Sequence, residues 1–217
     1  YKTGEILCAV SSPNYDPDDV PDLENDDSGR YDGVYVNRFT QSTYTPGSIF
    51  KLATTAAALE EIPDIQTRTF LCEGSYWVEG DEVICTGTHG EVNLRQALMH
   101  SCNCAFAQIA LTLGADTLMR YVEKFQITSP VVFDGVTTAE GNFDLTDAAN
   151  VNVAWAGIGQ YTDQINPCRY MTFMGQIAGG GVAAQPYLVE SVSSGMLSSY
   201  SAKTTMTDRV MSTAAAA

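Results

Sequence analysis

The sequence predicts an α+β or α/β domain. Apolar residues recur at the helical period of 3.6 through the middle of the chain, whereas strand-like segments lie toward its two ends. Hydrophobic residues make up 45% of the 217 residues, which is enough for one well-packed core. We therefore expect residues 1–217 to belong to one domain, with no second domain.

Strand signals occur in three parts of the sequence. Residues 5–11 are apolar and end at a Ser-Pro-Asn turn, so we expect a buried strand there. Residues 70–92 are rich in glycine and threonine and predict short strands joined by turns. Residues 186–192 predict a further strand.

Helices are predicted where apolar spacing coincides with start and stop signals. Asn93 and Gln96 resemble a capping box, and Asn166 with Pro167 is typical of a helix start. The expected helices cover residues 48–62, 93–99, 101–113, 116–124, 146–156, 167–178 and 204–217.

The charge balance restricts the classes of partner. With 26 acidic and 11 basic side chains, the net charge of -15 argues against binding to nucleic acid or to an anionic membrane surface. Seven of the acids lie between residues 16 and 27, where we expect a solvated loop. A calcium site is the sharper alternative, but the segment lacks the glycine-centred ligand pattern of an EF-hand. No apolar run approaches the roughly 18 residues of a membrane span.

The six cysteines are too few for a disulfide scaffold. Cys72 and Cys85 are the favoured disulfide pair, because the polar segment between them could close as a hairpin in an oxidising compartment. Cys8 and Cys168 lie in apolar stretches, so we expect both to be buried thiols. Cys102 and Cys104 lack the two-residue spacer of a zinc knuckle, and the chain has only two histidines. We therefore expect no metal site.

The most informative motif for chemistry is Ser48 followed three residues later by Lys51. On a helix this spacing lets the lysine amine reach the serine hydroxyl. Serine needs such a base to act as a nucleophile, and lysine can serve only if burial or nearby positive charge lowers its pKa. The preceding turn places Ser48 at a helix start, where backbone N–H groups can hold an oxyanion. Chance spacing is the alternative explanation of this pair.

A second motif is formed by Ser101 and Asn103 at the start of the next apolar helix. A serine there is ordinarily a helix cap. In the functional interpretation, Ser101 relays a proton and Asn103 directs its amide at a substrate peptide group. Another Ser-x-Asn triplet at residues 12–14 lies in a turn without a lysine partner, so the triplet alone is weak.

The order of these motifs resembles the penicillin-binding transpeptidase family, most closely its monofunctional, class B-like members. The resemblance runs from residue 3 to about residue 192. Its segments are 2–7, 11–17, Thr45 to Lys51, His89-Gly90, Ala97 to Asn103 with Phe106, 157–160, and 166–181 with Pro186.

The resemblance implies an α+β fold with a central antiparallel sheet flanked by helices. It also implies that Ser48 is the acylated nucleophile, Lys51 its base, and Ser101 with Asn103 the second motif. The expected substrates are D-Ala-D-Ala stem peptides of peptidoglycan, with β-lactams as mimics, and no cofactor is expected. Such proteins are anchored at the extracytoplasmic face of the membrane, where a glycosyltransferase is an expected partner.

The family's third motif, Lys-Thr/Ser-Gly, has no acceptable match after residue 186. Lys203-Thr204-Thr205 lacks the glycine, and Lys2-Thr3-Gly4 corresponds to the family's first hairpin turn. We expect the sequence to stop short of this motif, which would leave this fragment inactive or weakly active by itself. The alternatives are a non-catalytic β-lactam-binding scaffold that has lost the motif, and a serine β-lactamase, for which no deacylating glutamate can be assigned.

Overall fold

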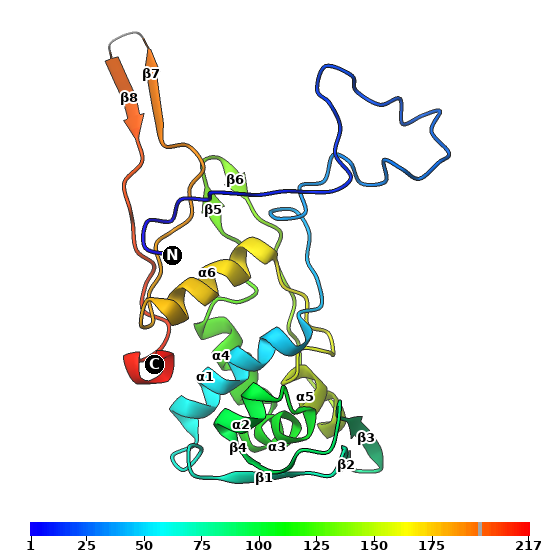
Figure 1. Ribbon diagram of the computed structural model, residues 1–217. Helices are drawn as coiled ribbons and strands as arrows, with labels where there is room; N and C mark the ends of the chain where they lie inside the picture. The colour runs from blue at the N-terminus through cyan, green and yellow to red at the C-terminus, as the bar shows by residue number, and fades with distance from the viewer. Residues whose placement is uncertain (195–196) are drawn as a thin grey trace.

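The computed structural model describes residues 1–194 and 197–217. Most helices gather in one body around a hydrophobic core, while the N-terminal segment and the hairpin of β7 (Ser191–Ser194) and β8 (Leu197–Ser201) extend away from it (Figure 1). The core helices are α1 (Lys51–Glu61), α3 (Asn103–Leu113), α4 (Ala115–Lys124) and α5 (Asn150–Ala156). Helix α3 is central, because it packs against the other three and against strand β1 (Thr69–Cys72).

The described strands form four separate antiparallel pairs rather than one continuous sheet. The predicted α+β class is confirmed, but the expected central sheet is not assembled by the described residues. The pairs are β1 (Thr69–Cys72) with β4 (Gly90–Asn93), β2 (Ser75–Val78) with β3 (Asp81–Ile84), β5 (Val132–Phe133) with β6 (Val136–Thr137), and β7 (Ser191–Ser194) with β8 (Leu197–Ser201).

The prediction of a buried strand over residues 5–11 is wrong. Leu7 is 85% exposed and Cys8 is also exposed, which contradicts the expected buried thiol. The physical reason is that the backbone pairing of residues 5–11, where described, is limited to the β-bridge between Glu5 and Tyr187, and residues 7–10 are exposed. Cys168, in contrast, is fully buried as predicted.

The helices with clear local signals form where the sequence predicts them. Helix α2 (Leu94–Met99) begins with the predicted capping box of Asn93 and Gln96. Helix α6 (Pro167–Ala178) begins at Asn166, whose side chain accepts a hydrogen bond from the Arg169 backbone N–H. The capping side chain satisfies an N–H group that has no partner inside the helix.

Three elements whose ends are marked less clearly in the sequence were predicted with the wrong extent. The helix expected over 146–156 starts only at Asn150, because the Thr146 N–H is held by the Asp144 side chain in a turn. The helix expected over 204–217 is confined to α7 (Thr213–Ala216), because Thr205 and Thr207 pair their backbones with residues 183–185. The strand expected over 186–192 begins only at residue 191.

Across the described residues, no helix is both long enough and apolar enough to cross a membrane.

Candidate active site

Ser48 is exposed and lies in a short 3-10 turn, η1 (Gly47–Phe50), directly before α1. Two hydrogen bonds tie the turn to distant parts of the chain. The Gly47 N–H donates to the Gly159 carbonyl at 2.8 Å, and the Tyr170 hydroxyl donates to the Ile49 carbonyl. Gly159 has a φ of +86°, and a Cβ there would lie 2.3 Å from the Gly47 carbonyl oxygen. Only glycine allows this approach of the two backbones.

The Lys51 side chain is fully buried and its amine meets four oxygens. Its Nζ lies 3.1 Å from Ser48 Oγ, 2.9 Å from Ser101 Oγ, 2.8 Å from the Ser101 carbonyl oxygen and 2.7 Å from Asn103 Oδ1. An ammonium has only three N–H donors. A neutral amine, with two donors and one lone pair, can donate to the Asn103 and Ser101 carbonyl oxygens and accept the Ser48 proton.

Burial lowers the pKa of Lys51 from its ordinary value of 10.5 to about 8, although the nearby Cys85 and Cys102 thiols act to raise it. The shift has the sign that a catalytic base requires, because removal from water disfavours the charged amine. A measurable fraction of Lys51 is therefore neutral near physiological pH and within reach of the Ser48 proton.

The second motif lies against Lys51 in an unusual backbone conformation. Ser101 has a φ of +51°, in the left-handed region, and is not the helix cap that its position suggested. Cys102 is the N-cap of α3, and its sulfur accepts the Ala105 N–H. Asn103 is the first residue of the helix and also donates from Nδ2 to the Ile84 carbonyl at 2.9 Å. Both polar atoms of the Asn103 amide are therefore hydrogen-bonded within the chain, to Lys51 and to Ile84, and its orientation toward a substrate stays a prediction.

A cluster of thiols and one imidazole lies immediately beside the second motif. The ligand atoms of Cys72, Cys85, His89 and Cys102 all lie within 4.8 Å of one another. All six cysteines are free, so the expected Cys72–Cys85 disulfide is not formed in the structure. Sequence reasoning missed this cluster, because it considered the local spacing around Cys102 while the other ligands come from two distant segments.

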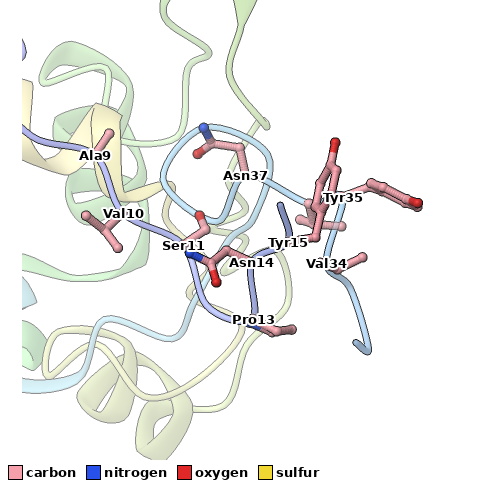
Figure 2. A pocket seen from close by; sticks show the side chains of 10 residues that line it. Ala9, Val10, Ser11, Pro13, Asn14, Tyr15, Val34, Tyr35 and Asn37 are labelled. Atoms are coloured by element: carbon pink, nitrogen blue, oxygen red, sulfur yellow. The ribbon is translucent and has the colours of Figure 1, made fainter. Parts of the chain in front are cut away.

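The second Ser-x-Asn triplet, at residues 12–14, is separate from this site. Pro13 and Asn14 line a cavity of about 460 Å³ between the N-terminal segment and residues 34–37 (Figure 2). No lysine is among the residues that line it. The interpretation of this triplet as a chance match is therefore consistent with the structure.

Comparison with known proteins agrees with this geometry. The family model of the penicillin binding protein transpeptidase domain matches residues 1–217. The chain belongs to this family. Ser48, Lys51 and the second motif of this transpeptidase domain thus meet in one place. The family assignment comes from the sequence match and does not depend on these contacts.

Among curated proteins, the transpeptidase domain is similar to the peptidoglycan D,D-transpeptidase PbpA of Mycolicibacterium smegmatis, with 32% identity over 95% of this chain and 45% of the relative. It is also similar to stage V sporulation protein D of Bacillus subtilis, with 30% identity over 87% of this chain and 29% of the relative. The chain thus spans less than half the length of these relatives.

Solved structures give the same result. The crystal structure of PBPA from Mycobacterium tuberculosis matches with a TM-score of 0.85 and 28% identity, over 99% of this chain and 53% of that chain. A penicillin G acyl-enzyme complex of penicillin-binding protein A from M. tuberculosis matches over the same shares, with a TM-score of 0.83. The predicted transpeptidase fold is confirmed.

Two contributors to the site were not singled out as site residues in the sequence. Gly159 and Tyr170 hold the turn that carries Ser48, but neither has a reactive side chain in a recognisable motif. The Gly-Ile-Gly run at residues 157–159 was the available signal, since paired glycines often mark a close backbone approach.

Proposed function

We propose that the protein is a D,D-transpeptidase of peptidoglycan crosslinking, and that residues 1–217 belong to its single catalytic domain. The observation that carries the proposal is the buried Lys51 amine, placed 3.1 Å from the exposed Ser48 hydroxyl. The names of the similar proteins support the same reaction, as do the β-lactam acyl-enzyme complexes among the similar structures.

In the proposed first step, Ser48 Oγ attacks the carbonyl carbon between the two D-alanines of a stem peptide, and its proton passes to Lys51 Nζ. The tetrahedral intermediate expels D-alanine as its amine takes a proton from Lys51, directly or through Ser101 Oγ, which lies 2.9 Å from Nζ. The product is an ester between Ser48 and the shortened stem peptide.

In the second step, the amine of a neighbouring stem peptide attacks this ester. The new amide forms, the bond to Ser48 breaks, and the proton lost by the amine returns to Ser48 through Lys51. β-Lactams would acylate Ser48 by the first step, but their ring-opened product keeps its leaving group attached.

The decisive experiment is labelling of the full-length protein with a fluorescent penicillin. We expect a long-lived covalent adduct on Ser48, located by peptide mass spectrometry and lost in Ser48→Ala. Ser12→Ala is the matched control, because it alters the other Ser-x-Asn triplet and should label normally.

The same experiment separates the two alternatives. Rapid hydrolysis of the antibiotic would indicate a serine β-lactamase instead. Absence of any adduct on folded full-length protein would leave a non-catalytic scaffold as the interpretation and refute the enzyme proposal.

The proposed place of action follows from the substrate. Peptidoglycan lies outside the cytoplasmic membrane, so we propose that the protein works at the extracytoplasmic face, attached by a helix outside this sequence. A membrane glycosyltransferase that makes the glycan strands is the proposed partner. Copurification of such an enzyme with the tagged full-length protein from membranes tests this part.

A further inference from the structure

The thiol and imidazole cluster beside the second motif is assembled from three separate segments. Cys72 ends β1, Cys85 and His89 lie in the loop between β3 and β4, and Cys102 is the N-cap of α3. Cys72 and Cys102 are fully buried, and the other two are half-buried. Each residue offers one ligand atom, and the four atoms lie within 4.8 Å of one another.

Three of the six separations among these atoms match the edges of a tetrahedron around a metal ion, and none exceeds 4.8 Å. With zinc–sulfur bonds of about 2.3 Å and zinc–nitrogen bonds of about 2.0 Å, a tetrahedral site has sulfur–sulfur edges of about 3.8 Å and sulfur–nitrogen edges of about 3.5 Å. Here Cys85 Sγ lies 3.9 Å from Cys102 Sγ. His89 Nδ1 lies 3.4 Å from Cys72 Sγ and 3.5 Å from Cys85 Sγ.

The surroundings of the sulfurs suit thiolate ligands. The Asn103 N–H donates to Cys85 Sγ at 3.2 Å, and the Ala105 N–H donates to Cys102 Sγ at 3.4 Å. Both N–H groups belong to the first turn of α3, whose partial positive charge favours negative sulfur. Backbone N–H donors of this kind orient and stabilise metal-bound thiolates.

We infer that Cys72, Cys85, His89 and Cys102 bind a structural zinc ion. Three soft thiolates and one imidazole in a closed tetrahedron are typical of structural zinc sites, which keep no position open for substrate. Binding releases the thiol protons to solvent, including the one that Cys72 shares with the Gly87 carbonyl at 3.4 Å.

The position of the ion gives it a consequence for the active site. Cys102 stands between Ser101 and Asn103, which together supply three of the four oxygens around Lys51. Fixing Cys102 to the β1 end and the β3–β4 loop would hold both neighbours in place against Lys51. The ion is thus expected to position the second motif without touching the substrate.

The first test measures metal directly in the full-length protein, purified under reducing conditions. We expect one zinc ion per chain by inductively coupled plasma mass spectrometry. After removal of zinc with a chelator, added Co²⁺ should give the intense visible bands and sulfur-to-metal charge-transfer absorption of a tetrahedral thiolate site.

The ligand variants have matched controls in the same chain. Cys85→Ser and His89→Gln should weaken zinc binding at least tenfold in competition with a chromophoric chelator. Cys168→Ser, at a buried thiol elsewhere, and His100→Gln, at the exposed imidazole stacked 5.2 Å from His89, should retain it. The cobalt spectrum of the unaltered protein keeps the test valid if a ligand variant does not fold.

Two outcomes would overturn the inference. One is a folded protein that takes up neither zinc nor cobalt with all its thiols reduced; the other is a Cys72–Cys85 disulfide in metal-free protein that added zinc does not displace under mild reduction. Metal content is measured without reference to acylation, so the zinc site and the transpeptidase proposal can fail separately. If both hold, zinc removal should slow penicillin acylation and added zinc should restore it.

Discussion

At the scale of single residues, the proposed role of Lys51 as a base requires its buried amine to exchange between a charged and a neutral form. Its amine is surrounded by oxygen acceptors, which favour the ammonium, whereas burial lowers its pKa to about 8. The protonation state of the Lys51 amine should therefore affect the rate of Ser48 acylation, since only the neutral amine can accept the Ser48 proton.

We therefore predict that penicillin acylation of Ser48 accelerates as pH rises through about 8. Below that value the neutral fraction, and with it the rate, should fall about tenfold per pH unit. Stopped-flow acylation between pH 6 and 9 measures this profile. Lys51→Arg, which stays charged throughout, should acylate roughly 100-fold or more slowly with no inflection near 8. A flat profile in the unaltered protein would refute the role of Lys51 as the base.

Ser101 combines a hydroxyl that contacts Lys51 with a backbone conformation that costs stability. Its φ of +51° places a non-glycine residue in the left-handed region, where the Cβ is crowded. Replacement by alanine removes the hydroxyl but keeps the crowding, while replacement by glycine removes both.

We predict that Ser101→Ala and Ser101→Gly slow acylation by similar factors, because both lose the oxygen that lies 2.9 Å from Lys51. Their stabilities should differ. The glycine variant should unfold at a higher urea concentration, because its free energy of unfolding should exceed that of the alanine variant by about 1 kcal/mol. Equal stability of the two variants would mean that the surrounding contacts, rather than Cβ crowding, set the conformation of Ser101.

At the scale of elements, the Ser48 turn depends on a loop more than 100 residues away in the sequence. Gly159 accepts the Gly47 N–H, and a Cβ on Gly159 would also lie 2.7 Å from Phe50 Cβ. Ser48 is therefore positioned by packing of its turn against residues 157–160 as well as by its own helix.

We predict that Gly159→Ala lowers both stability and acylation, because the added methyl group pushes the Gly47 and Phe50 backbone away from the loop. Gly135→Ala is the control: its φ of +79° imposes the same backbone penalty, but nothing lies within 4 Å of the added carbon. Both variants should lose about 1 kcal/mol to the left-handed backbone, and only Gly159→Ala should also acylate slowly. Thermal melts and labelling rates measured side by side give the comparison.

The elements that the sequence predicted well are those that local chemistry specifies. The capping box at Asn93 and the Asn166–Pro167 start need only neighbouring residues, and both helices begin as predicted. The segments at 5–11 and 204–217 were mispredicted, because their conformation depends on pairing with residues 183–187. The Ser48 and Lys51 contact was predictable from one turn of helix, while the cysteine cluster required the fold to bring three segments together.

At the scale of the whole molecule, one buried acid links global stability to pH. Asp163 is fully buried, and this burial raises its pKa from 3.8 to about 8, against the opposing effect of the Asp163 and Tyr161 backbone N–H groups. Between these two values the folded chain keeps a proton that the unfolded chain releases. Stability must therefore fall as pH rises through this window.

We predict that the free energy of unfolding decreases by up to about 1.4 kcal/mol per pH unit between pH 5 and 8 through Asp163. Asp163→Asn keeps the shape without the titration, so its stability should exceed that of the unaltered protein by an amount that grows with pH. Asp208→Asn, at an exposed position, is the control and should leave the pH dependence unchanged. Urea unfolding at several pH values measures the difference between variants, which cancels the contribution of the other acids. A difference that is constant with pH would show that Asp163 is already ionised in the folded chain.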